Sequence, residues 1–267
     1  MKSRRFSWAA ALFLLGAFSA SSQIPSTVYL DELTWPELRH EIDAGKTTII
    51  VPIGGTEQNG PHMVLGKHNV RVNALSAKIA RTLGNALVAP VIAYVPEGGV
   101  SPPTGHMRFP GTITVPNATF EQVLESAARS FKAHGFRDIV FLGDHGGYQS
   151  SERTVADRLD REWRSTPVRV HAVTEYYQAT MTSFPQQLKN RGYADAEIGT
   201  HAGLADTSLT LAVDPRLVRA DQLAGKPEAA AGVYGDPRRS SAELGQLGVD
   251  AIVAQTVAAI NAATKRR

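Results

Sequence analysis

The sequence predicts an α/β fold of three layers, in which a mostly parallel sheet is flanked by helices. Short apolar, β-branched runs alternate along the chain with longer amphipathic segments, which is the βαβ rhythm typical of parallel sheets. Hydrophobic residues make up an ordinary 43% of the chain. About 245 residues remain after the first 22, which is enough for one α/β domain with a large core.

The first helix and strand have clear local signals. Thr34 and Glu37, three residues apart, form a capping box, so a helix is predicted to begin there and to run to about Ala44. The β-branched run 47–53 predicts a strand, although Pro52 within it favours an early end to the pairing.

The remaining segments continue the alternation. The Pro- and Gly-rich passage 96–111 is too long for a simple connection, which indicates a functional loop. Residues 224–246, rich in Gly, Ala, Pro and Ser, predict a second long loop. The other predicted elements are a helix over 70–83, an apolar stretch over 86–95, a strand over 112–115, a helix over 119–134, a strand over 138–142, a helix over 149–163, a strand over 168–173, and helices over 204–213 and 249–263.

The N-terminus has the parts of a secretory signal peptide. Lys2, Arg4 and Arg5 form a basic start, residues 8–18 are an apolar run, and small residues follow at 19–22. The apolar run is too short to span a bilayer comfortably. We therefore predict a cleaved signal peptide.

The predicted processing leaves residues 1–22 as the signal peptide and 23–267 as a single domain. It implies a periplasmic or secreted protein with no stable membrane insertion after processing. General secretion is favoured over twin-arginine export and over an uncleaved anchor lying on the membrane surface.

The charge of the processed chain gives no reason to expect nucleic acid as a partner. Three of the 28 basic residues lie in 1–22, which leaves 25 basic against 25 acidic residues. The sequence pI of about 9.2 therefore reflects the precursor. The chain has no cysteine, which excludes disulfides and thiolate metal ligands.

Carboxylate and imidazole groups cluster directly after the strand predicted over 47–53. The loop that follows carries Glu57, His62 and His68 between glycine and proline residues. Glutamate oxygens and imidazole nitrogens are ligands suited to zinc, manganese or iron. The loop therefore indicates a metal site, with a surface loop of hydrogen-bonded histidines as the alternative.

Two further segments favour the metal site. His145 follows another buried strand and lies among glycines, which allow a ligand to approach the backbone closely. His201 and Asp206 lie five residues apart at the start of a predicted helix. A lone histidine is more often structural, but three such segments in one chain favour a common site.

Several short motifs follow one another in a fixed order along the chain. They are Leu33-Thr34-Trp35, Pro52 to Gln58, Gly60-Pro61-His62, His106 to Thr112, Gly143 to Gly147, His201-Ala202-Gly203 with Asp206-Thr207-Ser208, and Gly235-Asp236-Pro237. Through these motifs the chain, from about Leu33 to about Gly245, resembles the creatininase (creatinine amidohydrolase) family of metal-dependent hydrolases.

The resemblance implies a metal-dependent hydrolase of a C–N bond in a small cyclic or linear amide, acting through metal-activated water, and the predicted signal peptide implies that this hydrolase is exported. It implies a homo-oligomer, zinc as the first choice of metal, and manganese or iron as the others. A catalytically inactive family member that serves as a binding or assembly protein is the alternative.

The first motif departs from the family pattern at two ligand positions. Asn59 stands where the family usually has histidine, and His68 stands where it has an aspartate that bridges two metals. A neutral imidazole does not normally bridge two divalent cations, so we expect one ion rather than two. With these two departures taken into account, the predicted ligands are Glu57, His68 and His145. Asp206 is either a further ligand or a residue that orients one of them.

The resemblance also assigns catalytic and substrate-binding residues. His201, which matches the catalytic histidine of the family, is predicted to protonate the leaving nitrogen, and His106 is the second catalytic candidate. Arg108 either lines the substrate entrance with His106 or packs a turn. Tyr148 points either into the pocket or into the core, and His62 has a supporting hydrogen-bonding role beside the substrate.

Two absences narrow the chemistry. Thr200 replaces the glutamate that creatinine-hydrolysing members carry, which argues against creatinine as the substrate. The chain has no Gly-x-Ser-x-Gly elbow, which disfavours a serine nucleophile.

Overall fold

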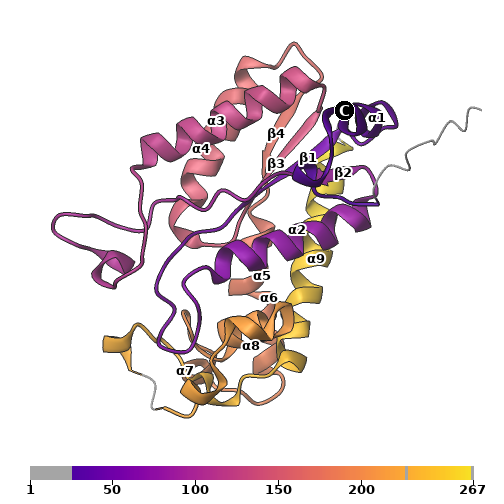
Figure 1. Cartoon of the computed structure of the whole chain (residues 1–267). Helices are drawn as coiled ribbons and strands as arrows, with labels where there is room; N and C mark the ends of the chain where they lie inside the picture. Colours follow the sequence, from indigo (N-terminus) through magenta and orange to yellow (C-terminus); the bar gives the residue numbers. More distant parts are fainter. Residues whose placement is uncertain (1–25, 226–227, 266–267) are drawn as a thin grey trace, which may run out of the picture.

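The computed structural model describes residues 26–225 and 228–265, and the predicted signal peptide lies outside them. Within the described residues, a four-stranded sheet in the order β2-β1-β3-β4 has helices on both faces (Figure 1). Every strand pair is parallel, which confirms the predicted fold class. The strands are β1 (Thr48–Ile53), β2 (Ala86–Val88), β3 (Asp138–Gly143) and β4 (Arg169–Ala172).

The sheet separates two hydrophobic cores. Successive residues of a strand point to opposite faces, so Ile50 lies in one core while its neighbours Ile49 and Val51 lie in the other. The first core is closed by α2 (Lys67–Leu83), α5 (Glu175–Met181), α6 (Ser183–Lys189), α8 (Leu204–Val213) and α9 (Ala242–Thr264). The second is closed by α1 (Trp35–Asp43), α3 (Asn117–His134) and α4 (Gln149–Glu162).

The central strands are buried on both sides, which explains their unbroken apolar sequences. Pro52 is tolerated within β1 because β2 ends opposite Ile50, where Val88 is its last partner. After β2 the chain continues beside β1 without regular strand pairing, and the Ile92 N–H donates to the Pro52 carbonyl oxygen at 3.0 Å.

Several boundaries confirm the predictions, and some differ. The capping box forms, since the Glu37 carboxylate accepts from the Thr34 N–H at 2.7 Å, and α8 has the predicted bounds. The predicted strand over 112–115 is wrong. The Ile113 N–H donates to the Thr56 carbonyl oxygen, whereas the Val115 N–H donates to the Val95 carbonyl oxygen in a separate segment. These residues therefore form no regular strand ladder.

Two other boundaries matter for function. Helix α2 begins at Lys67 rather than at residue 70, so His68 belongs to its first turn instead of the preceding loop. The apolar stretch 86–95 contributes only the short strand β2. Between β4 and α8 the chain forms α5, α6 and α7 (Asp195–Ile198), which have no predicted counterpart.

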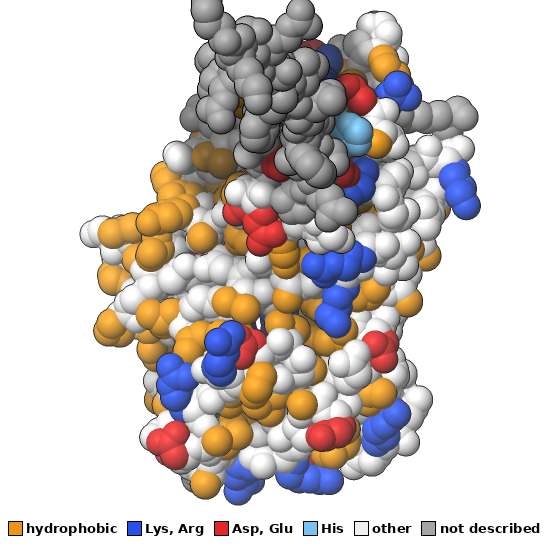
Figure 2. All heavy atoms as spheres, turned by 45° about the vertical axis from the view of Figure 1, so that its right-hand side comes forward, with side chains coloured by type: hydrophobic (Ala, Val, Ile, Leu, Met, Phe, Trp, Pro, Cys, Tyr) orange, Lys and Arg blue, Asp and Glu red, His pale blue; other side chains and the backbone are white. Residues whose placement is uncertain are grey.

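Helix α9 is long and apolar enough to cross a membrane, with a mean hydropathy of 1.3. Its residues Val249, Ile252 and Ile260 are buried in the first core, where it packs along α2, α5 and α8. Figure 2 shows hydrophobic side chains interspersed with acidic and basic ones on the side of the molecule that carries α9 in Figure 1. Within the described residues, 28% of its most apolar window is buried by these contacts.

A buried carboxyl group lies behind the end of β3. Glu152 of α4 is 0% exposed, and neither of its oxygens has a hydrogen-bond partner among the described residues. Burial raises its pKa to about 8. Gly143 allows this approach, because a Cβ atom there would lie 2.1 Å from the Glu152 Oε1.

This carboxyl group predicts a specific pH dependence of stability. Its pKa is raised in the folded state, so between about pH 4.3 and pH 8 the folded protein holds a proton that the unfolded chain has lost. Stability from this group is therefore lost as the pH rises through that interval. We expect Glu152→Gln to gain at least about 1 kcal/mol relative to the wild type between pH 5 and pH 8, measured by denaturant unfolding. Glu175→Gln, an exposed control in α5, should show no such trend, and a constant difference for Glu152→Gln would contradict the assignment.

Candidate metal centre and active-site cavity

The candidate site forms where the two central strands end. Ile53 and Gly143 are paired at the carboxyl ends of β1 and β3, so the loops that follow leave the sheet side by side. Those loops carry Glu57 and His145. The Glu57 side chain is fully buried, and its Oε2 lies 3.8 Å from His145 Nε2 and 3.1 Å from His106 Nε2.

Glu97 also belongs to the candidate site, although the sequence motifs do not include it. Its buried carboxylate has Oε2 3.7 Å from His145 Nδ1. The approach needs a glycine at position 55, where φ is +146° and a Cβ atom would lie 2.7 Å from the Glu97 Oε1. Glu97 is the sole acidic residue of the loop 96–111, whose length already indicated a function.

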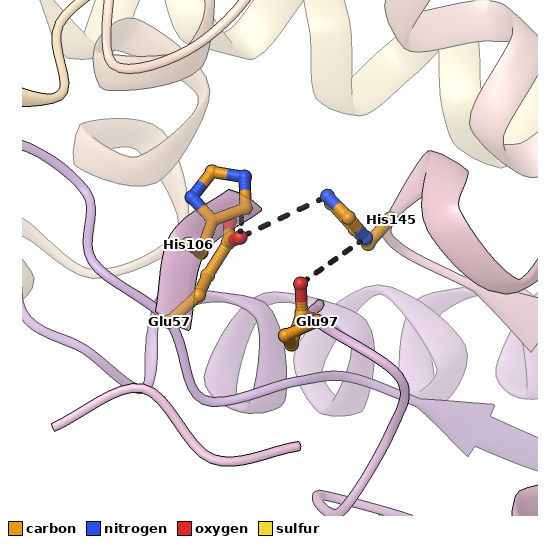
Figure 3. A group of neighbouring side chains, drawn as sticks. All are labelled: Glu57, Glu97, His106 and His145. Carbon is orange, nitrogen blue, oxygen red and sulfur yellow. Dashed lines mark ion pairs between the residues drawn. The ribbon is translucent and has the colours of Figure 1, made fainter. Parts of the chain in front are cut away.

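Four side chains converge on one point (Figure 3). Glu57, Glu97, His106 and His145 each offer a ligand atom, and these atoms all lie within 4.8 Å of one another. The Glu57 Oε2 and both Glu97 oxygens are buried and have no hydrogen-bond partner among the described residues. A buried carboxylate without a partner is costly. Two carboxylates and two imidazoles form a donor set that fits a divalent cation, which would satisfy these oxygens.

The electrostatics of the group agree with this fit. Burial, together with the negative charge of Glu57, raises the pKa of Glu97 to about 9. Burial would also raise the pKa of Glu57, but the hydrogen bond from His68 and the positive charges of His68 and Lys67 bring it below its usual range. Burial lowers the pKa of His145 to about 4, so its imidazole is neutral at neutral pH and has a free lone pair. A bound cation would favour loss of the Glu97 proton.

The predicted ligands His68 and Asp206 lie outside this group of four. Both ring nitrogens of His68 face carboxylates, with Nε2 2.7 Å from the Glu57 Oε1 and Nδ1 2.6 Å from the Asp144 Oδ2. Asp206 pairs with the Lys67 ammonium group and with the Arg71 guanidinium group. Glu57 and His145 are the predicted ligands that the structure brings together.

Asn59, at the first departure from the family pattern, forms hydrogen bonds within the loop that follows β1. Its Nδ2 donates to the carbonyl oxygens of Glu57 at 2.9 Å and Val64 at 3.0 Å. It therefore supports the backbone of the loop that carries Glu57.

A cavity of about 410 Å³ opens beside the group. His106, His145 and His201 line it, as does Thr200. The His201 ring lies 4.7 Å from that of His106, and its Nδ1 is 3.8 Å from the Glu57 Oε1. Burial lowers the pKa of His201 to about 3, so this imidazole is neutral at neutral pH. The lining also includes apolar side chains, namely Met181, Phe184, Pro185, Ile198 and Leu209.

The three residues predicted to bind substrate lie elsewhere than on the walls of this cavity. Arg108 is exposed. Tyr148 is fully buried in the core, where its hydroxyl donates to the Ile53 carbonyl oxygen at 2.9 Å and accepts from the His145 N–H at 3.1 Å. His62 is buried with its Nε2 3.0 Å from the Thr207 Oγ1. Tyr148 thus ties His145 to the end of β1.

The chain matches known proteins over most of its length. The family model for creatininase, described as creatinine amidohydrolase, matches residues 31–260. The creatinine amidohydrolase of Pseudomonas putida is 30% identical over 225 residues, which cover 81% of this chain and 85% of the relative.

Solved structures agree with the sequence comparison. A creatininase described by its manganese superposes with a TM-score of 0.75 at 28% identity, covering 89% of this chain and 98% of the other. A creatininase variant of the Zn–Zn type superposes with a TM-score of 0.75 at 27% identity, covering 90% of this chain and 99% of the other.

The group of four makes a testable prediction about metal content. We expect Glu97→Gln to lower zinc affinity at least about tenfold, because the neutral amide cannot balance the charge of a cation. Equilibrium dialysis followed by elemental analysis measures this directly. Glu152→Gln is the matched control, since it alters another buried glutamate that lies outside the group. Wild-type zinc affinity in Glu97→Gln would remove Glu97 from the site.

Proposed function

The chain belongs to the creatininase family, and on that premise we propose that it is a metal-dependent hydrolase of an amide C–N bond in a small molecule. The family model and the Pseudomonas putida relative support a hydrolase that acts on a C–N bond. The observation that carries the metal dependence is the set of buried, unpartnered carboxylate oxygens on Glu57 and Glu97 beside two neutral imidazoles.

We propose that Glu57, Glu97, His106 and His145 hold one divalent cation. Zinc is the first choice, and manganese and iron are the alternatives. This set keeps two of the ligands predicted from the sequence and exchanges the other two for Glu97 and His106. A cation bound there supplies Lewis acidity, which acidifies water and polarises the carbonyl group of an amide.

His201 is the proposed proton carrier. It lies on the cavity wall beside His106, so it can take up the proton that an attacking water loses and return that proton to the leaving nitrogen as the C–N bond breaks. His201 therefore acts first as base and then as acid.

The other residues of the earlier predicted set have proposed supporting roles. His68 donates to the Glu57 Oε1 and orients the carboxylate that faces the cation. Tyr148 positions the backbone of His145. Asp206 orients the charged side chains Lys67 and Arg71.

The cavity supports a substrate that is part polar and part apolar. His106, His145 and His201 give the cavity polar lining, and Met181, Phe184 and Leu209 give it apolar lining. Thr200 stands on the cavity where creatinine-hydrolysing relatives carry a glutamate. We therefore propose a small amide other than creatinine.

Cellular context and assembly are also proposals. The N-terminal pattern supports export to the periplasm or the medium, and the family resemblance supports a homo-oligomer. The alternative function is a catalytically inactive binding or assembly protein, and the presence of a complete donor set favours the enzyme over it.

Hydrolysis by metal-stripped and metal-reloaded protein tests the proposal. Creatinine, creatine, lactams, cyclic imides and short linear amides are incubated with the protein, and the carboxylate and amine products are measured by mass spectrometry. We expect at least one amide to be cleaved, with activity lost on chelation and restored by zinc or manganese. His201→Ala should lower kcat by about 10²- to 10⁴-fold at unchanged metal content, whereas His134→Ala, an exposed control, should not. A protein that binds no metal and cleaves none of these amides would favour the inactive alternative.

A further inference from the structure

The wall of the cavity next to the group of four is cationic. Lys67, the first residue of α2, is only 1% exposed, although lysine is rarely buried. Its side chain lines the cavity, and its Nζ pairs with the Asp206 carboxylate. Arg71, one helical turn later, lines the same wall. This wall therefore places a buried ammonium group in the cavity that His106 and His145 also line.

Asp206 holds the Lys67 ammonium group in place. The Asp206 Oδ1 accepts from Arg71 Nη1 at 2.7 Å, and its Oδ2 accepts from the Ala202 N–H at 2.9 Å as well as from Lys67. The Ala202 backbone has φ of +54°, in the left-handed region that a residue other than glycine rarely adopts. A strained turn, an arginine and a lysine thus share one carboxylate, which leaves the carboxylate little freedom to turn elsewhere.

The cationic wall balances its charges internally. Its two cations, Lys67 and Arg71, face two carboxylates, Asp144 and Asp206. Asp144 accepts from Arg71 Nε at 2.8 Å and from the Tyr176 hydroxyl at 2.8 Å, and it also faces His68. Unlike Glu57 and Glu97, neither aspartate has a buried oxygen without a partner. None of these described carboxylates therefore has a free oxygen that could bind a second metal ion.

The Lys67 ammonium group still has hydrogen-bonding capacity. It carries three N–H groups, and Asp206 is its one side-chain partner among the described residues. The remaining N–H groups belong to a group that lines the cavity. The positive charge of Lys67 also lowers the pKa values of Glu57, His106 and His201. Its electric field therefore reaches the group of four as well as His201.

We propose that the Lys67 ammonium group takes the place of a second metal cation in this site, and that it binds the substrate oxygen on which negative charge develops. This inference rests on the proposed function and deepens it. An ammonium group fixed by a buried carboxylate stabilises such an oxygen without the ligands that a second ion needs. The substrate then lies between one exchangeable cation and one that is part of the chain.

Metal stoichiometry of a Lys67→Ala variant tests the exclusion of a second ion. Removing the ammonium group leaves the Asp206 Oδ2 with the Ala202 N–H as its remaining partner and leaves one excess negative charge on this wall. Isothermal titration of metal-free protein with zinc, with elemental analysis of the loaded protein, should give one ion per chain for the wild type and a second, weaker ion for Lys67→Ala. Lys189→Ala is the matched control, because Lys189 lines the same cavity and pairs with Asp195 at 2.6 Å, outside the cationic wall. It should bind one ion.

Kinetics test the contact with substrate. Lys67→Gln removes the charge while retaining a donor for Asp206, so it should keep one zinc ion and the folded state and lose about 10²-fold in kcat. Added methylamine should restore part of the activity of Lys67→Ala and none of any activity lost by Lys189→Ala, because it replaces the missing ammonium group in the space left by Lys67.

The outcomes separate this inference from the proposed function. A wild type that binds no ion contradicts both. A wild type that binds two ions, or a Lys67→Ala protein that binds only one, overturns the role of Lys67 and leaves the metal-dependent hydrolase intact. Full kcat in Lys67→Gln likewise overturns it. Should Lys67→Ala fail to fold, the stoichiometry of the wild type and the kcat of Lys67→Gln still decide.

Discussion

The buried carboxylate of Glu57 is the group on which the rest of the site depends. It is removed from water at the end of β1, so each of its oxygens must be balanced by positive charge or by a donor. Oε1 faces His68, which in turn faces Asp144, so one side is satisfied by the protein itself. Oε2 faces His106 and His145 and has no hydrogen bond of its own. This asymmetry divides the site into a side whose hydrogen bonds are complete and a side on which the carboxylate oxygen has no hydrogen-bond partner among the described residues.

Helix α2 explains why the complete side needs so many charged groups. Lys67 and His68 lie in its first turn and Arg71 follows at the start of the second, near the end of the helix where positive charge opposes the helix dipole and burial removes the stabilising water. Asp144 after β3 and Asp206 in α8 offset both penalties through ion pairs. Removal of Asp206 would leave the Lys67 ammonium group without its carboxylate partner, and removal of Asp144 would leave Arg71 paired with Asp206 alone, so these groups depend on one another. The first core, in which α2 packs against the sheet and against α8 and α9, keeps them at a fixed separation.

The sequence predicted the fold class because strands buried on both faces leave continuous apolar runs, and it predicted Glu57 and His145 because both directly follow such runs. Glu97 was missed because its loop has no periodic pattern and it meets Glu57 only through the fold.

The start of α2 was misplaced because Gly66 precedes it without a side-chain cap, which hid the helical position of His68 and the role of Lys67. The run 112–115 has β-branched residues typical of a strand, but no neighbouring strand is available to pair with it. For Tyr148, whose position in pocket or core the sequence left open, the hydrogen bonds to the ends of β1 decide for the core.

The central claim is that one half of the site holds a single exchangeable cation and the other half holds a fixed ammonium group. Crystals of the zinc-loaded protein, measured on both sides of the zinc absorption edge, test this most directly. The account predicts one anomalous peak within bonding distance of Glu57, Glu97, His106 and His145, with the Lys67 ammonium group still paired with Asp206. Two peaks, or a single peak bound by His68 and Asp206, would contradict it.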